Sequence, residues 1–307
     1  MTSTRPGGEP ARRRAGFVAV IGAPNAGKST LLNRLIGAKI AIVTPKVQTT
    51  RARAIGILIH GPAQLVFVDT PGIFEPSRRL ERAMVSAAWR GAETADIVLL
   101  LVDAARPADA DTARIMEGLR NARHEAVLAL NKIDLVKRPE LLPLADRLRK
   151  EGIFSRVFMI SGATGDGVSE LVDYLAERIP EGPWLYPEDQ LSDVSERLLA
   201  AEVTREQLFL QLQQELPYAL TVETESWKEL EDGSVRIDQI IYVLRESQKP
   251  ILLGKGGRRI RSVGSAARKE LERMLERRVH LFLFVKVRPD WIDRVAHYRA
   301  MGLEYKA

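Results

Sequence analysis

A glycine-rich segment directly after an apolar run constrains this chain more than any other feature. Residues 22–30 read GAPNAGKST and follow the apolar run FVAVI at 17–21. They fit the pattern G-x-x-x-x-G-K-[ST], in which backbone N–H groups turn inward around phosphate oxygens and the next helix points its positive end at them. Lys28 would reach the β and γ phosphates and the Ser29 hydroxyl would ligate Mg²⁺. The segment therefore predicts a nucleotide site, with candidate residues Gly22, Asn25, Ala26, Gly27, Lys28, Ser29 and Thr30.

Short apolar runs alternate with helical stretches through residues 16–180. The runs, rich in Val, Ile and Leu, lie at 17–21, 54–60, 64–70, 97–103, 126–132 and 156–161. Nearly continuous apolar runs suit strands that are buried on both faces. Strands that alternate with helices predict a parallel sheet covered on both sides. We expect a doubly wound α/β sheet of the P-loop NTPase class, with a Ras-like GTPase arrangement.

Three further segments end predicted strands in the order and spacing of a GTPase. They are DTPG at 69–72, NKID at 131–134 and SGA at 161–163. Open α/β sheets bind ligands at the carboxyl ends of their strands, so these segments should meet the glycine-rich loop. Asp69 would hold Mg²⁺ through water, and the Gly72 N–H would contact the γ-phosphate.

The NKID segment predicts selection of guanine. The Asp134 carboxylate can accept hydrogen bonds from N1–H and the 2-amino group of guanine, a donor pair that adenine lacks. A buried carboxylate would be left unpaired against adenine, which discriminates far better than shape alone. Asn131 can bond to N7 or to neighbouring loops, and the Lys132 stem would cover the base. A backbone N–H of Ser161, Gly162 or Ala163 can reach guanine O6.

The segment 43–54, VTPKVQTTRARA, has no apolar period and lies where a mobile switch is expected. A threonine there could ligate Mg²⁺ only when the γ-phosphate is present, which would tie loop order to the nucleotide state. Thr50 is the first choice and Thr49 the second. Together with Ser29 and Asp69, Thr50 completes the predicted metal set, and with Lys28 it is a predicted catalytic residue.

Charge is distributed unevenly along the chain. The net charge is +6, yet residues 254–288 hold eleven Lys and Arg against three Glu. This basic segment suggests a polyanionic partner, either nucleic acid or an anionic membrane surface. The absence of cysteine excludes disulfides and cysteine-ligated zinc and suits a reducing compartment. No apolar run approaches the ~20 residues needed to span a bilayer. We expect a cytoplasmic protein that is a monomer.

The segment PEGPWLYP at 180–187 marks a domain boundary. We expect a disordered basic tail at 1–15, a GTPase domain at 16–180, a linker at 181–191 and a second domain at 192–307. The second domain should begin with one helix over 192–217, capped by Asp193 and Glu196. Two strands at 218–225 and 234–246, two helices, the strand 279–289 and a short helix from Asp290 should follow.

The segment Gly254-Lys255-Gly256-Gly257 fits the G-x-x-G loop of KH domains. The apolar run 250–253, interpreted as a strand, precedes it, and a basic helical turn follows. In that setting a loop and two helices clamp four nucleotides of single-stranded RNA, because glycines let the backbone approach the sugar–phosphate chain. Lys255, Arg258, Arg259 and Arg261 would supply positive charge. We expect a small α+β domain of the type II KH class that binds RNA.

These motifs resemble the Era GTPases, within the group that includes TrmE and EngA. The likeness extends through ELPYALTVE at 215–223, the segment 251–272 and VHLFLFVKVRPDW at 279–291, and only the tail lies outside it. It implies binding to the 3′ end of small-subunit (16S) rRNA and a role in maturation of the 30S subunit. The family usually has Ser-Ala where this chain has Ser161-Gly162, which predicts a looser loop with unchanged specificity.

The resemblance also implies slow hydrolysis. Ras-like enzymes orient the attacking water with a Gln just after D-x-x-G, and Ile73 stands at that place here. In several related enzymes the asparagine of the glycine-rich loop helps to bind K⁺, which offsets phosphate charge; Asn25 matches it and is a third catalytic candidate.

We expect a two-domain GTP switch that binds RNA, and the sequence leaves two alternatives open. One is an RNA-binding assembly factor in which hydrolysis only resets the protein. The other is a GTPase that uses the basic segment for peripheral association with anionic membrane at the inner face of the cell membrane.

Overall fold

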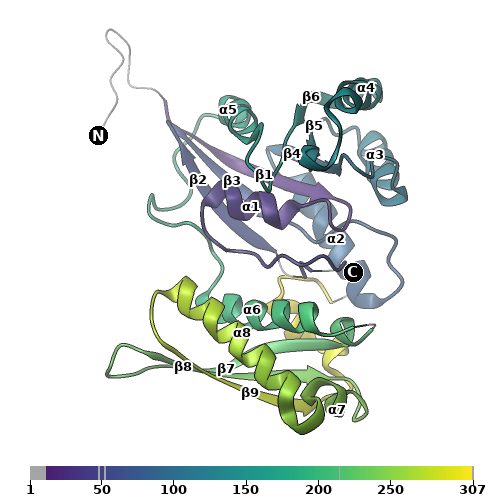
Figure 1. Ribbon diagram of the computed structural model, residues 1–307. Helices are drawn as coiled ribbons and strands as arrows, with labels where there is room; N and C mark the ends of the chain where they lie inside the picture. The colour runs from purple at the N-terminus through teal and green to yellow at the C-terminus, as the bar shows by residue number, and fades with distance from the viewer. Residues whose placement is uncertain (1–11, 48, 52, 214, 306–307) are drawn as a thin grey trace. The chain divides into compact units, whose positions relative to one another are not determined.

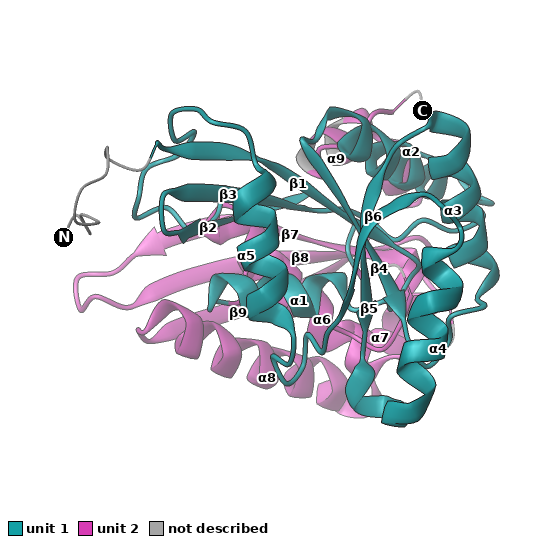
Figure 2. Ribbon diagram, turned by 90° about the horizontal axis from the view of Figure 1, so that it is seen from above, with its two compact units in different colours: residues 1–38, 50–193, 307 teal, residues 39–49, 194–306 magenta. Residues whose placement is uncertain are grey.

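The computed structural model describes residues 12–305 except 48, 52 and 214, and the predicted tail therefore lies largely outside the described residues. The chain divides into two compact units (Figure 2). Unit 1 comprises residues 1–38 and 50–193, and unit 2 comprises residues 39–49 and 194–306. The predicted switch, residues 43–54, is therefore divided between the units: residues 43–49 belong to unit 2 and residues 50–54 to unit 1.

Unit 1 is built on a six-stranded sheet in the order β2-β3-β1-β4-β5-β6 (Figure 1). The strands are β1 (Arg14–Gly22), β2 (Ala54–His60), β3 (Ala63–Asp69), β4 (Ile97–Asp103), β5 (Ala126–Asn131) and β6 (Phe154–Met159). Neighbouring strands are parallel except β2, which pairs antiparallel with β3. The prediction of a wholly parallel sheet was therefore wrong for β2. Only Gly61 and Pro62 separate β2 from β3, and two residues allow a hairpin but no crossover.

Helices cover both faces of this sheet (Figure 1). They are α1 (Lys28–Ile36), α2 (Arg79–Thr94), α3 (Ala110–Ala122), α4 (Arg138–Arg149) and α5 (Val168–Arg178), with a 3₁₀ turn η1 (Ile133–Leu135). Ala88 of α2 and Ile115 of α3 pack with alternate β4 residues such as Leu100. Helices α1 and α5 lie against β2 and β3. The predicted doubly wound sheet is confirmed, and it places the ends of β1, β3, β4 and β5 along one edge.

The predicted linker, residues 181–191, is part of unit 1 and is held there by several hydrogen bonds. The side-chain oxygen of Gln64 accepts from the backbone N–H groups of Leu185 and Tyr186 at 2.7 and 3.0 Å. Trp184 Nε1 donates to the Pro62 carbonyl at 3.1 Å. At the other end of unit 1, β1 already begins at Arg14, inside the segment assigned to the tail.

Unit 2 has a three-stranded sheet in the order β7-β8-β9. The strands are β7 (Leu220–Glu229), β8 (Val235–Val243) and β9 (Val279–Val287); β7 and β8 are antiparallel, and β8 and β9 are parallel. The helices are α6 (Glu196–Gln211), α7 (Gln248–Leu253), α8 (Arg258–Leu275) and α9 (Val295–Ala300), with 3₁₀ turns η2 (Leu216–Ala219), η3 (Lys255–Gly257) and η4 (Trp291–Asp293). Ala201 and Leu208 of α6 and Val263 of α8 form one cluster over the strands. This arrangement confirms the predicted order of elements.

Three local predictions in unit 2 were wrong. Residues 250–253 form the end of helix α7, in which only Leu252 is buried, and Pro250 lies in the first turn, where it costs no helical hydrogen bond. Ser195 caps α6, and its hydroxyl accepts from Leu198 N at 3.3 Å, whereas Asp193 accepts from the backbone of Ile55. Helix α6 ends at Gln211 instead of continuing to residue 217.

Candidate functional site

The glycine-rich loop joins β1 to α1 and surrounds the Lys28 side chain. Gly27 has a φ of 98°, and a Cβ there would lie 2.3 Å from Asn131 Nδ2, so only glycine fits. Lys28 Nζ donates to the carbonyls of Gly22 and Ala23 at 3.0 Å each. Burial lowers the pKa of Lys28 to about 8, and the Asp69 charge opposes that shift. The ammonium is held inside the loop, where phosphate oxygens are expected.

Three oxygen-bearing side chains meet beside Lys28. Ser29 Oγ lies 2.9 Å from Thr50 Oγ1 and donates to Asp69 Oδ2 at 2.8 Å. Asp69 is fully buried, and its Oδ1 has no hydrogen-bond partner among the described residues. Burial raises the pKa of Asp69. Hydroxyl and carboxylate oxygens are ligands that Mg²⁺ prefers, and an unpartnered buried carboxylate oxygen fits a water held by that ion.

The two threonines of the switch occupy different surroundings. The Thr50 hydroxyl belongs to the cluster with Ser29 and Asp69. The Thr49 hydroxyl instead bonds to Thr44 Oγ1 and to the Lys46 carbonyl, each at 2.7 Å. The geometry therefore favours Thr50 as the switch ligand.

The DTPG turn lies against the glycine-rich loop. Ile73 N donates to the Gly22 carbonyl at 3.1 Å, and the Ile73 side chain is fully buried. A Cβ on Gly72 would lie 3.0 Å from Pro24 Cα, so the two loops touch through their backbones. The residue after the motif offers no group that could orient water.

The NKID segment is anchored by its asparagine and lysine. Asn131 Nδ2 donates to the Ala26 carbonyl at 2.8 Å, and its Oδ1 accepts from Gly162 N at 2.9 Å. Lys132 Nζ pairs with Asp103 Oδ2 at 2.7 Å. Asp103 ends β4 and was missed in the sequence, although its place after the run LLLV was a signal.

Asp134 departs from the expectation of a buried carboxylate. It is exposed, and it accepts no hydrogen bond within the described part of the chain. Both carboxylate oxygens are therefore available to a base, and burial would come from the base itself. Discrimination against adenine then depends on how much of the Asp134 carboxylate a bound purine shields from water.

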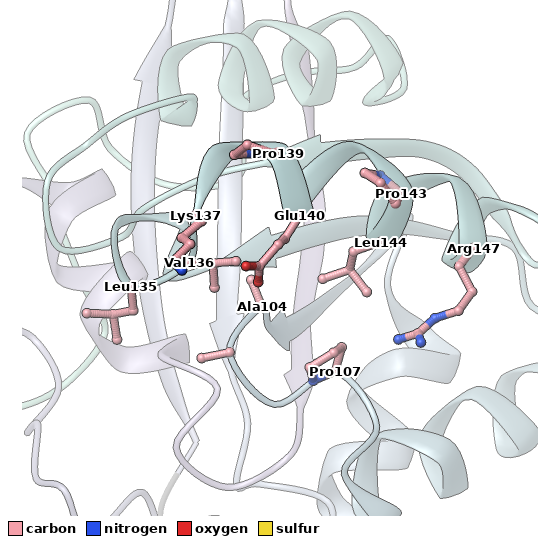
Figure 3. Close-up of a pocket in the computed structure, with 11 residues that line it drawn as sticks. Ala104, Pro107, Leu135, Val136, Lys137, Pro139, Glu140, Pro143, Leu144 and Arg147 are labelled. Atoms are coloured by element: carbon pink, nitrogen blue, oxygen red, sulfur yellow. The ribbon is translucent and has the colours of Figure 1, made fainter.

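An open pocket of about 790 Å³ lies next to this segment (Figure 3). Its lining comes from the loop after β4, including Ala104 and Pro107, and from 135–147, including Leu135, Leu144 and Arg147. None of the predicted nucleotide residues lines it.

In unit 2, the G-x-x-G loop forms η3 between α7 and α8. Gly254 has a φ of 71°, and a Cβ there would lie 2.8 Å from Arg259 Cβ. Lys255, Arg258, Arg259 and Arg261 are all exposed. A pocket of about 600 Å³ beside the loop is lined by Glu246, Lys249, Pro250, Leu253, Gly254 and Lys255.

All three arginines also donate hydrogen bonds to carbonyls of the loop or of α7, and Arg258 Nε donates to the Lys255 carbonyl at 3.4 Å. Arg259 Nη1 donates to the Ile251 carbonyl at 2.6 Å, and Arg261 Nη2 donates to the Gly256 carbonyl at 2.8 Å. Lys255 remains the least constrained of the predicted RNA contacts.

Comparisons with known proteins agree with both domains. The family model "50S ribosome-binding GTPase" matches residues 17–132, and the model "KH domain" matches residues 215–292. The GTPase Era of Sinorhizobium medicae is 60% identical over 292 residues, which cover 95% of this chain and 94% of the relative. The GTPase Era of Bradyrhizobium diazoefficiens is 54% identical over 305 residues and 99% of both chains. The chain belongs to the Era family of GTPases.

Two solved Era structures match the fold of the whole chain. Aquifex aeolicus Era Y63A bound to GDP·AlF₄⁻ aligns with a TM-score of 0.88, and an Era complex with MgGDPNP and nucleotides 1506–1542 of 16S ribosomal RNA aligns with 0.89. Each is 38% identical and covers 94% of this chain and 99% of the matched chain. This Era-family protein is thus a GTPase that binds GTP and GDP, with a Ras-like domain followed by a KH domain. Within the described residues, no helix combines the length and apolarity needed to cross a membrane.

Proposed function

We propose that this protein is a GTP-controlled switch that binds the 3′ end of 16S rRNA and assists maturation of the 30S subunit. One observation carries the proposal: an Era protein that aligns with both units of this chain is bound to nucleotides 1506–1542 of 16S rRNA. The GKGG loop supplies the matching chemistry. Its glycines let the sugar–phosphate chain approach, and Lys255 and the arginines of the first turn of α8 supply positive charge.

Hydrolysis is assigned to the cluster in unit 1. Lys28 would bind the β and γ phosphates, and Ser29, Thr50 and Asp69 would hold Mg²⁺. That ion would neutralise charge that develops on the transferred phosphoryl group. Ile73 is buried and apolar, so water must be oriented by backbone groups or by a partner, and the intrinsic rate is slow.

We extend this proposal to K⁺. Asn25 has a φ of 62° in the glycine-rich loop, a conformation that asparagine tolerates better than most residues. A cation held there would offset phosphate charge as an arginine finger does. Turnover should be higher in K⁺ than in Na⁺ buffer, and Asn25→Ala should remove the difference. Equal turnover of the wild type in both buffers would exclude the cation role.

The switch part of the proposal rests on contacts of residues 39–49 within unit 2. Lys39 Nζ pairs with Glu206 Oε2 of α6 at 2.6 Å and with Glu270 Oε1 of α8 at 3.0 Å. Val43 N donates to Glu206 Oε1 at 2.8 Å, and Lys46 donates to carbonyls at the end of α6. The segment is therefore tied to both helices that cover the KH sheet, and α8 begins at the GKGG loop.

The attached segment is joined directly to the nucleotide site through the chain. Thr50 follows the segment directly and belongs to the metal cluster of unit 1. Capture of Thr50 by a γ-phosphate-bound Mg²⁺ would fix one end of a segment whose other contacts are on α6 and α8. Nucleotide state would then alter the freedom of the KH helices and so the affinity for RNA.

The test is the affinity for a single-stranded oligonucleotide of the 16S 3′ end at fixed salt. It is measured by fluorescence anisotropy with GDP and with a non-hydrolysable GTP analogue, beside a scrambled oligonucleotide. We expect sequence-dependent binding that differs between the two nucleotides. Lys255→Ala should weaken binding and reduce the salt slope by about one, as loss of one phosphate contact predicts. Lys228→Ala, which removes an exposed lysine from β7, is the matched control.

The other outcomes identify the alternatives. Specific binding that is equal in both nucleotide states would leave an assembly factor with hydrolysis as a reset. Loss of preference for the 16S sequence would contradict the rRNA assignment; binding to anionic vesicles that depends on Lys255 would then favour the membrane alternative. Because the matched GTPase model is described by binding to the 50S subunit, isolated 30S and 50S subunits are compared in the same assay.

A further inference from the structure

The SGA segment begins a tightly closed loop, 161–167, in which most backbone groups are occupied. Ser161 N donates to the Asp166 carbonyl at 2.9 Å, and the Ser161 carbonyl accepts from Gly165 N at 2.8 Å. Gly162 N donates to Asn131 Oδ1. Ala163 N has no hydrogen-bond partner among the residues that the structure describes. The amide of Ala163 is therefore a free donor beside the NKID segment.

Arg34 holds the carbonyl of that same peptide unit. From the last turn of α1, Arg34 Nε donates to the Gly162 carbonyl oxygen at 2.7 Å, and Nη2 donates to the Ala163 carbonyl oxygen. The Gly162 carbonyl and the Ala163 N–H belong to one planar peptide group, so fixing the oxygen also fixes the direction of the N–H. The guanidinium lies against Gly165, where a Cβ would be 3.1 Å from Arg34 Nη1.

A cation on a peptide oxygen also changes the donor on the other side of the peptide. Charge-assisted hydrogen bonds are roughly twice as strong as neutral ones, and a polarised peptide donates a stronger hydrogen bond through its N–H. Arg34 additionally connects this loop to α1, the helix that begins at Lys28. The guanine end and the phosphate end of the site are thereby joined through one helix.

We infer that Arg34 is a positioning residue for guanine, which orients and polarises the 162–163 peptide toward O6 of the base. It also compensates for Gly162, because the loop that the sequence predicts to be looser is clamped by two side-chain donors. The inference rests on the assignment of SGA as the loop that reads O6, and it does not involve RNA binding.

The experiment compares two ligands that differ only at O6. They are GDP and 6-thioguanosine diphosphate, in which a sulfur that accepts hydrogen bonds weakly replaces O6 while N1–H and the 2-amino group remain. Dissociation constants are measured by calorimetry for the wild type, Arg34→Ala and Arg34→Lys. Arg14→Ala is the matched control, because Arg14 Nη1 likewise donates to two carbonyls of unit 1, those of Glu177 and Ile179, at 3.1 and 2.8 Å.

We expect Arg34→Ala to weaken GDP binding about tenfold, the scale of one lost charge-assisted contact, and to weaken 6-thioguanosine diphosphate binding much less. The preference of the wild type for O6 over sulfur should shrink in this variant, and Arg34→Lys should restore part of it. For hydrolysis, KM for GTP should rise with little change in kcat. Arg14→Ala should leave the ratio of the two dissociation constants unchanged.

Each other result has a distinct meaning. Equal weakening of both ligands by Arg34→Ala would overturn the inference, because a merely structural arginine affects both alike. A wild type that binds the two ligands equally would overturn the assignment of the SGA loop itself. Thermal unfolding of each variant accompanies the titrations, and Arg34→Lys keeps the test valid if Arg34→Ala does not fold.

Discussion

The buried guanidinium of Arg205 donates a hydrogen bond to the main-chain oxygen of Thr49. Arg205 is held in turn by Glu202, with Nε 2.7 Å from Oε1. The residue after Thr49 is Thr50, whose hydroxyl lies 2.9 Å from that of Ser29. One peptide bond therefore separates a residue fixed by the KH unit from a residue fixed by the nucleotide site.

Replacement of Arg205 should uncouple the two functions. Arg205→Ala removes the anchor of Thr49, so RNA affinity should become similar with GDP and with a GTP analogue, while nucleotide affinity changes little. Loss of a buried donor that leaves partners unpaired costs about 1–3 kcal/mol, so unit 2 should also unfold at lower temperature. The measurement is the RNA anisotropy titration in both nucleotide states.

The control for this variant lies on the same helix. Arg197 of α6 donates to the carbonyls of Thr224 and Glu225 at 3.0 and 3.1 Å, far in sequence from the switch. Arg197→Ala should preserve the nucleotide dependence of RNA binding. If it abolishes that dependence as fully as Arg205→Ala does, general weakening of α6 is the cause.

Thr50 and Thr49 should respond differently to the same change. Thr50→Val removes a hydroxyl from the Ser29–Asp69 cluster, so we expect GTP-analogue affinity and hydrolysis to fall about tenfold or more while GDP affinity stays near that of the wild type. Thr49→Val removes a hydroxyl bonded only within the switch segment and should leave hydrolysis nearly unchanged. Stopped-flow binding and phosphate release measure both, and a larger effect at Thr49 would reverse the assignment.

The ion pair between Lys39 and Glu270 of α8 should lower the pKa of Glu270 measurably. Hydrogen bonding from Arg273, together with the hydrogen bond and charge of Lys39, lowers the pKa of Glu270 to about 2. A glutamate whose folded pKa is depressed contributes stability above its unfolded value of about 4.3, and that contribution is lost as pH falls toward 2.

The measurement for Glu270 is an NMR titration of its carboxyl carbon. Lys39→Ala should raise the pKa and reduce the loss of stability between about pH 4.3 and pH 2, because one source of the depression is gone. Lys228→Ala should leave the Glu270 pKa as it is. An unchanged pKa in Lys39→Ala would mean that Lys39 and Glu270 are not paired in solution.

Asp134→Asn should change which base is bound. An amide can accept from N1–H and donate to the O2 of xanthine, whereas it offers a donor where guanine also offers one. We expect GDP affinity to fall by a factor of about 100 or more and xanthosine diphosphate affinity to rise. Competition binding with both nucleotides measures this, and retained preference for GDP would argue against Asp134 as the base-reading residue. Glu140→Gln, at the neighbouring pocket, is the control for loss of one carboxylate.

The nucleotide site was largely predictable because its residues lie in short segments at strand ends. Lys28, Asp69 and Asn131 each end or follow a buried strand, and parallel strands bring such ends to one edge. The exposure of Asp134 was not predictable, because burial depends on what surrounds a loop. Arg34 was missed because the carbonyls that it contacts, those of Gly162 and Ala163, lie far from it in the sequence. Asp103 was missed although it ends a buried strand, because its lysine partner lies on a different strand end.

The sequence by itself determined the chemistry of both loops and the class of both domains, because backbone-bound phosphate sites and amphipathic elements are encoded over short stretches. Only the tertiary structure decided that the hydroxyl of Thr50, and not that of Thr49, lies with Ser29 and Asp69, and that residues 39–49 fold with the KH unit. Those outcomes depend on contacts between residues far apart in the chain, such as Lys39 with Glu270. Such contacts form only once packing has brought helices and loops together, so no local pattern records them.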